Sequence, residues 1–143
     1  MCGKAKLSGL LLPFLLAACV DEDAHHKINV QWPEQRIVFV ADTRIGAVLA
    51  LAQNDPARLL ARSQIPLRAR VLGLQLDKAR GRLWVLGTRS LDVHDAYSLV
   101  LQKHIALSTD EAVSLQHDGL AIGLYSRRGM LLGRVDARTL AVR

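Results

Sequence analysis

The chain has 143 residues, which is about the size of one globular domain rather than two. Half of the residues are apolar and 22% are charged, a balance that excludes an intrinsically disordered protein. The formal net charge of +6 could favour nucleic acid as a partner, but the arginines are scattered and aromatic residues make up only 4% of the chain. We therefore expect no nucleic-acid binding.

The first twenty residues have the layout of a secretory signal peptide. Lys4 and Lys6 precede an apolar run at 7–16, and small residues then lead to a cysteine at position 19. A membrane-spanning helix needs about 20 apolar residues, so this run is too short to span a bilayer. A core helix is the alternative, but it would have to place Pro13 in its interior at a cost of about 3 kcal/mol.

The four residues at 16–19, Leu-Ala-Ala-Cys, resemble the lipobox of bacterial lipoproteins. The resemblance implies that residues 1–18 are a removed signal peptide, that cleavage falls between Ala18 and Cys19, and that Cys19 is lipidated. Acyl chains would then hold the protein to a membrane. Val20 rather than an aspartate follows the cysteine, which in such lipoproteins implies an anchor in the outer membrane of the bacterial cell envelope, facing the periplasm.

Two further segments follow the signal peptide. Residues 19–27 are short, polar and acidic after the cysteine, so we expect them to form a tether. Residues 28–143 are expected to form one β-rich domain, because their apolar runs are short, rich in branched residues and bounded by turn-forming residues. The clearest runs lie at 36–41, 82–86 and 120–125. Their near-continuous apolar character predicts strands that are covered on both faces.

An internal repeat with a period of about 40 residues organises this domain. The pattern Asp-Ala-x-x-Leu begins at Asp95 and Asp136, and a related copy begins at Asp55. A second marker, Leu-Gln-x-Asp, occurs at 74–77 and again one period later at 115–118, and the segment 30–33 is a weaker match before the first copy. We interpret the repeated aspartates as turn formers, because a carboxylate can accept the backbone N–H two residues further on.

Each repeat unit divides into four short strands, which for the second unit fall at about 70–76, 82–88, 91–95 and 98–107. Four strands at a period of about 40 residues are typical of a β-propeller blade. The segments 38–43, 77–85 and 93–96 resemble the NHL and YVTN repeats of bacterial propellers.

The number of units leaves the architecture open. Only three fit the chain, whereas closed propellers have about four to eight blades. We therefore expect an all-β fold of three four-stranded antiparallel blades, forming a partial propeller or one completed by dimerisation. A partner protein that caps the arc, a truncated propeller and a β-sandwich or barrel are the alternatives.

The sequence carries no nucleophile elbow, zinc-protease, Walker A or dinucleotide-binding motif. The alternative enzymatic function is a metal-dependent hydrolase, because some propellers, such as lactonases, hold a divalent cation in a central funnel, and the resemblance implies that polar residues from several blades could do so here. No other cofactor is expected. The candidate metal ligands are Asp42, Asp77, His94, His117 and Asp118.

A binding or scaffolding module at the membrane is the function we favour from the sequence. Large aromatic side chains and arginines often contribute much of the energy of a protein interface. Its partner would be another protein or a second copy of the chain. The candidate contact residues are Trp84, Tyr97, Arg127 and Arg128.

Overall fold

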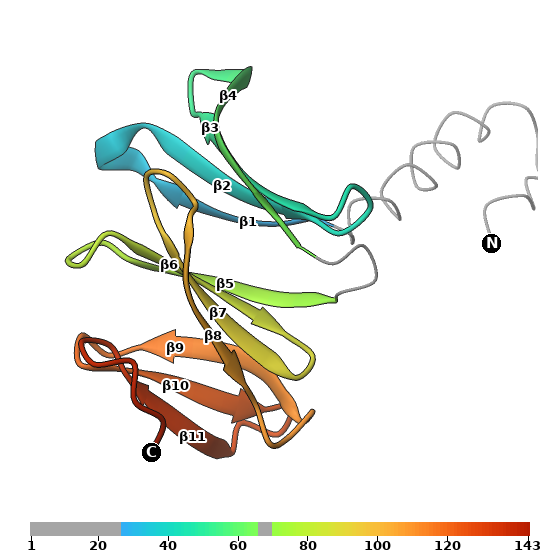
Figure 1. The fold of residues 1–143 in the computed structure, drawn as a ribbon, viewed down its shortest axis with the longest axis vertical. Coiled ribbons are helices and arrows are strands. Elements are labelled where there is room, and N and C mark those ends of the chain that lie inside the picture. The colour runs from blue at the N-terminus through green and yellow to red at the C-terminus, as the bar shows by residue number, and fades with distance from the viewer. Residues whose placement is uncertain (1–26, 66–69) are drawn as a thin grey trace, which may run out of the picture.

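The computed structural model describes residues 27–65 and 70–143, and it is almost entirely β-structure. Its strands form three antiparallel sheets, which stack on one another along the long axis of the molecule (Figure 1). The predicted signal peptide, Ala18, Cys19 and most of the tether lie outside the described residues. Within the described part of the chain, no helix has the length and apolar character needed to cross a membrane.

Each sheet is a blade in which the strands pair in chain order. Blades 1 and 2 have four strands and blade 3 has three. A short 3-10 helix, η3 (Pro33–Gln35), joins the first two strands of blade 1. Blade 1 comprises β1 (Lys27–Trp32), β2 (Ile37–Asp42), β3 (Ala47–Ala52) and β4 (Asp55–Gln64); blade 2 comprises β5 (Val71–Asp77), β6 (Arg82–Gly87), β7 (Ser90–Asp95) and β8 (Leu101–Ala106); blade 3 comprises β9 (Ala112–His117), β10 (Ala121–Ser126) and β11 (Leu131–Asp136).

The first strand of each blade lies innermost. Strand β5 contacts both β1 and β9, so the three first strands line the inner side of the arc. The last strands of blades 1 and 2, β4 and β8, are mostly exposed. This arrangement confirms the predicted all-β fold of three blade-like repeats and excludes the alternative of a single barrel.

Two apolar cores hold the blades together, one at each junction between blades. Phe39 of β2 projects from blade 1 into the first core, where it meets residues of blade 2 such as Leu83. Trp84 of β6 projects from blade 2 into the second core, where it meets residues of blade 3 such as Ile122. Both aromatic side chains are fully buried, and we call such a side chain a plug.

The Asp-Ala-x-x-Leu repeat builds the turn after the third strand of blades 2 and 3. Asp95 Oδ1 accepts backbone N–H groups from Tyr97 at 2.9 Å and from Ser98 at 2.8 Å, as predicted for a turn former. Leu99 then adopts a left-handed conformation, with φ of 57°, and returns its side chain to the core. The equivalent Leu140 in blade 3 has φ of 64°, so the same device occurs in both blades.

The first copy of the repeat does not form this turn, because Asp55 lies three residues beyond the end of β3 at Ala52, whereas Asp95 and Asp136 are the last residues of their third strands. Ala96 donates its N–H to Gly81 O at 2.8 Å, and Ala137 donates to Leu120 O at 2.9 Å. In blade 1 the equivalent hydrogen bond runs from the N–H of Gln53 to Arg36 O at 2.8 Å. Strand β4 instead begins at Asp55, whose Oδ1 accepts one backbone N–H at 3.3 Å.

Two further details of the repeat differ from the sequence interpretation. In blade 1, Val30 rather than Gln31 pairs with the plug Phe39, whereas in blade 2 Gln75 pairs with Trp84. The weak match at 30–33 is therefore displaced by one residue, which reverses the face on which each side chain lies. In blade 3 the fourth strand is reduced, within the described residues, to a bridge between Val135 and Val142.

Candidate interaction surface

Two of the predicted metal ligands meet at the junction of blades 2 and 3. His117 Nε2 of β9 lies 3.5 Å from Asp77 Oδ2 at the end of β5. Asp77 is fully buried and also accepts a hydrogen bond from Arg80 Nη1 at 3.1 Å. Arg80 Nη1 is in turn 3.1 Å from the backbone oxygen of Gly119 in blade 3. The carboxylate therefore joins two blades through a cationic side chain and an imidazole.

The other three predicted ligands lie apart from this pair. Asp118 is exposed, with its Oδ2 3.0 Å from Arg134 Nη2, and the backbone N–H groups of Leu120 and Ala121 lower its pKa. Asp42 accepts the backbone N–H of Arg44 in the turn after β2.

His94 is buried in blade 2. Its Nδ1 lies 3.2 Å from the backbone oxygen of Leu99 and 3.4 Å from Ser63 Oγ of blade 1. Burial lowers the pKa of this imidazole, because desolvation disfavours the charged form. Within residues 27–65 and 70–143, the His, Cys, Asp and Glu side chains form no group of three or more that could hold a metal ion.

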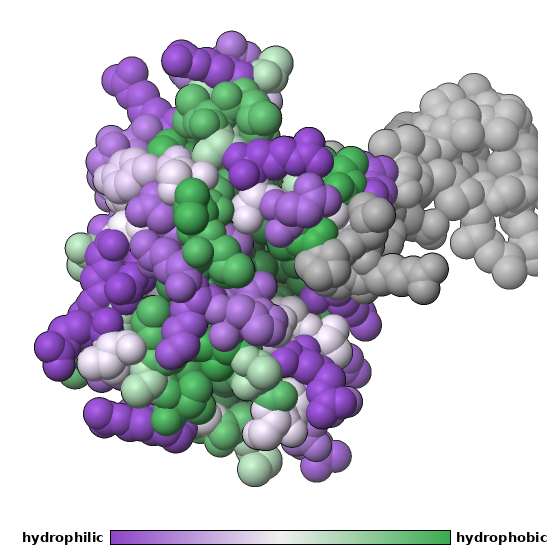
Figure 2. Space-filling view, in the orientation of Figure 1, coloured by the Kyte–Doolittle hydropathy of each residue, from purple (hydrophilic) through white to green (hydrophobic). Residues whose placement is uncertain are grey.

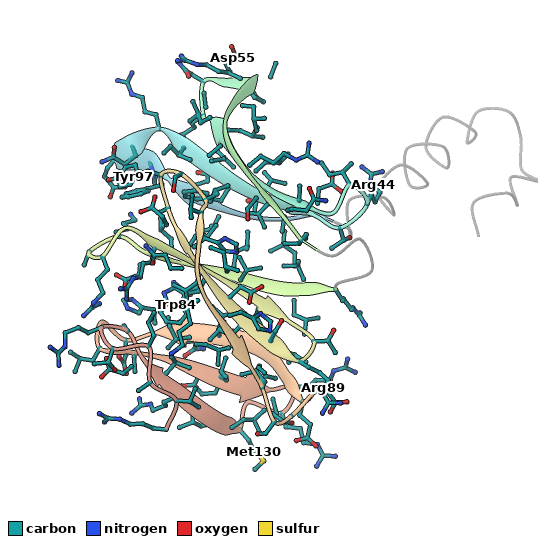
Figure 3. All side chains as sticks on the ribbon, in the orientation of Figure 1. Arg44, Asp55, Trp84, Arg89, Tyr97 and Met130 are labelled. Atoms are coloured by element: carbon teal, nitrogen blue, oxygen red, sulfur yellow. The ribbon has the colours of Figure 1, made fainter. Side chains whose placement is uncertain are left out.

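Trp84 cannot act as a surface anchor, since its side chain is 0% exposed between blades 2 and 3 (Figure 3). This corrects its assignment as a contact residue, because the ring packs between blades. Tyr97 is 54% exposed, and its ring lies 5.1 Å from that of Trp32 in blade 1. Arg127 and Arg128 lie exposed in the turn between β10 and β11, where they line a cavity of about 400 Å³ with Met130.

The most apolar uncovered sheet face belongs to blade 1. Alternation along the strands places one set of side chains toward blade 2 and the opposite set on the outer end of the arc. In the described structure no sheet packs on that second set, and Figure 2 shows hydrophobic atoms at the top of the molecule over β3 and β4. We call this set the open flank; it consists of Val38, Val40, Leu49, Leu51 and Leu59, and the exposed polar residues Asn29 and Gln31 of β1 and Arg62 of β4 lie at its edges.

The open flank and the first core lie on opposite faces of blade 1. Val38 and Val40 alternate along β2 with the plug Phe39, and the cross-strand pairs Val40 with Leu49 and Val38 with Leu51 place four aliphatic side chains together. These four side chains are half-buried, and Leu59 on the outer strand β4 is 51% exposed. Such a contiguous apolar face is typical of a site for another sheet.

The outward sheet face at the opposite end of the arc is polar rather than apolar. On blade 3 the face turned away from blade 2, which we call the far flank, carries mainly polar or small residues. Gly123 lies at its centre, and the ring of Tyr125 lies over it so closely that a Cβ at Gly123 would be 2.8 Å from Tyr125 Cε2. The residues of the far flank are Ser114, Gln116, Gly123, Tyr125, Leu131 and Arg134.

Gly123 occupies the position of the plug. Trp84 pairs with Gln75 on the first strand of its blade, and Gly123 pairs with Gln116 on the first strand of blade 3. The two glutamines belong to the two copies of the Leu-Gln marker, so they are equivalent positions of neighbouring repeats. Blades 1 and 2 thus each present a fully buried plug to the next blade, whereas on blade 3 the half-buried ring of Tyr125 lies over the glycine at that position.

Neither flank was predicted from the sequence. A comparison of the buried strands would have shown a large aromatic residue at 39 and 84 and a glycine at 123. It could not have shown which face of β2 stays uncovered, because that depends on how the blades stack.

The sequence matches no protein-family model and no curated protein. Solved structures are nevertheless similar in fold. Sqt1 from Saccharomyces cerevisiae superposes with a TM-score of 0.63 at 14% identity over 75% of this chain and 30% of its own. The N-terminal domain of Nup159 has a TM-score of 0.57 at 12% identity over 80% of this chain and 32% of its own. The computationally designed Ika4 protein has a TM-score of 0.55 at 14% identity over 67% of this chain and 57% of its own.

These similarities concern the fold, because the sequence identities are low. The described chain spans about a third of the Sqt1 and Nup159 chains. Two of its sheets have four antiparallel strands and the third has three, with first strands innermost, which is the arrangement of propeller blades. The protein therefore contains three consecutive blades of a β-propeller-like fold.

Proposed function

We propose that this protein is a lipid-anchored binding module of the bacterial cell envelope. Cleavage between Ala18 and Cys19 and lipidation of Cys19 would attach it to the outer membrane on the periplasmic side. Residues 19–27 would then tether the propeller-like domain, 28–143, to the lipid. The order of charged residues, apolar run, small residues and cysteine supports the anchor.

The observation that carries the binding function is the open flank of blade 1. Its side chains are those of an inter-blade face, yet no described sheet covers them. Covering apolar surface contributes about 25 cal/mol for each Å² removed from water. A protein partner that covers this face would gain that energy, and the module would act as a scaffold.

The metal-dependent hydrolase receives no comparable support. Asp77 and His117 are 3.5 Å apart, but Asp77 is already paired with Arg80. Asp118 pairs with Arg134 on the exposed side of blade 3. The observed pairings give the acidic side chains structural roles, so we propose binding rather than catalysis.

Labelling of cells with a radioactive or clickable fatty acid tests the anchor. The full chain should take up the label and separate with the membrane fraction, and Cys19→Ser should lose the label and remain unprocessed. Ala17→Ser, which keeps a small residue in the lipobox, is the matched control and should be labelled normally. Release of an unlabelled, normally cleaved wild-type protein into the soluble fraction would contradict lipidation.

Photo-crosslinking in cells tests the binding surface. A photoreactive residue at Val40, in the centre of the open flank, should give one discrete adduct with another protein. The same residue at Gln116, on the far flank, should give none and serves as the control. Equal adducts from the two positions would show that the open flank is not the binding surface.

A further inference from the structure

The open flank is the face of blade 1 that is turned away from the next blade. The two junctions between described blades show what packs against the same face of blades 2 and 3. Blade 2 turns Leu83 and Val85 toward blade 1, where they meet the plug Phe39. Blade 3 turns Ile122 and Leu124 toward blade 2, where they meet the plug Trp84. In both cases a face of aliphatic side chains receives a sheet with one large aromatic side chain at its centre.

The open flank repeats this aliphatic face. Val38 and Val40 stand on the second strand of blade 1, as Leu83 and Val85 do on β6 and Ile122 and Leu124 do on β10. Each pair lies on the face turned away from the next blade. The open flank therefore resembles the two faces that pack against a sheet with a plug.

A second copy of the chain does not supply that sheet. Its far flank has Gly123 in the plug position, with Tyr125 folded over the glycine and Arg134 beside it. A head-to-tail ring would bury Gln116 and Arg134 of this face against aliphatic side chains, with the half-buried ring of Tyr125 over Gly123 in place of a fully buried plug. Polar outer faces are typical of the terminal repeats that cap repeat proteins.

Pairing of two open flanks with each other reproduces neither internal junction. Each junction joins an aliphatic face to a face that carries a plug. The open flank carries no aromatic side chain, so two of them would meet without a plug.

We infer that the occupant of the open flank is a different protein, which presents a β-sheet face with a large aromatic side chain at its centre and packs on blade 1 as a further blade. This inference rests on the proposed binding function and names the chemistry of the partner. The polar far flank of blade 3 keeps the chain from closing on its own copies, and no described sheet covers the open flank, so this face can receive that partner.

A designed donor chain tests the recognition of a plug. The donor carries Gly123→Trp, Tyr125→Leu and Arg134→Val, so that its far flank resembles the face of blade 2 that bears Trp84, Leu86 and Val93. It also carries Val40→Glu, which blocks its own open flank with a charge. Light scattering of the full-length chains in detergent then reports the protein mass of each mixture.

The donor and the wild-type chain should form a one-to-one complex of about twice the protein mass of the 15.7 kDa chain. The wild-type chain alone should be monomeric. A Val40→Glu acceptor with an otherwise wild-type sequence is the matched control, and it should bind the donor at least tenfold more weakly. Failure of a folded donor to associate with the wild-type chain would overturn the inference.

Two further outcomes are informative. A wild-type dimer that Val40→Glu dissociates would show that a second copy is the occupant, which also overturns the inference while leaving membrane anchoring intact. If circular dichroism shows that the donor does not fold, peptide sequencing of the adduct from the photoreactive residue at Val40 replaces it. The crosslinked partner segment should be a strand with an aromatic residue beside the crosslink, and a segment of this same chain or a strand without one would contradict the inference.

Discussion

Removal of the plug between blades 2 and 3 is the sharpest test of the architecture. Trp84 is 0% exposed and fills the second core, so Trp84→Ala leaves a cavity where a large ring was packed. Truncation of a buried tryptophan costs about 3 to 5 kcal/mol. For a domain of this size, about 1 kcal/mol shifts the melting temperature by about 4 °C, so the variant should melt about 12 to 20 °C lower than the wild-type protein.

The indole nitrogen of Trp84 gives a second, more discriminating variant. Among the described residues this buried N–H has no hydrogen-bond acceptor. An unsatisfied buried donor costs about 1 to 3 kcal/mol. Trp84→Phe removes that donor and keeps an aromatic ring in place, so the free energy of unfolding should fall by less than about 2 kcal/mol.

Urea unfolding followed by far-ultraviolet circular dichroism measures both variants, because that signal arises mainly from the peptide backbone. The matched control is Tyr97→Ala, which removes an exposed ring from its contact with Trp32 and should cost about 0.5 to 1.5 kcal/mol. A Trp84→Ala cost below about 1 kcal/mol would refute the packing of blade 3 on blade 2. So would a Trp84→Phe variant that is as unstable as Trp84→Ala.

Three other predictions concern polar groups. Arg82→Met should lower the free energy of unfolding by about 1.5 to 3 kcal/mol in urea titrations, because Arg82 Nη1 donates a hydrogen bond to Ala137 O across two blades at 2.6 Å. Backbone N–H groups lower the pKa of Asp95 and Asp136, so the stability that these carboxylates contribute is present above the unfolded pKa of about 3.9 and is lost as pH falls through the folded pKa. The double variant with asparagine at both positions should therefore show a weaker fall of melting temperature below about pH 4, and an unchanged slope would contradict this role. Burial lowers the pKa of His94, so the wild-type protein should lose stability as pH falls below about 6.5, and His94→Asn should reduce that loss in melting curves between about pH 5 and 7.

Local signals in the sequence were sufficient for the fold class and the turns. The repeated Asp-Ala-x-x-Leu pattern predicted the turns at Asp95 and Asp136, because the acceptor and the N–H groups are separated by only two or three residues. The prediction for Asp55 holds only in part: its carboxylate accepts the N–H of Ala57, two residues further on, but Asp55 lies three residues beyond the end of β3. The predicted strands of blade 2 agree with β5 to β8 within a few residues.

The positions of the candidate site residues could not be predicted in the same way. Asp77 and His117 belong to different repeats and meet because the first strands of adjacent blades lie side by side. Asp118 follows His117 directly, yet it points to the exposed Arg134. Whether such side chains meet in space depends on how the blades stack, and no local sequence pattern predicts that stacking.

The sequence by itself determined the three-unit repeat, the β-strands and the layout of the first twenty residues, because each of these depends on neighbours along the chain. Only the tertiary structure decided which face of each strand is covered. Phe39 and Val40 are adjacent apolar residues of one strand, but Phe39 fills a core between blades and Val40 lies on the open flank. The physical reason is the two-residue period of a strand, which places neighbouring residues on opposite faces. Whether a face is buried then depends on the sheet that stacks against it.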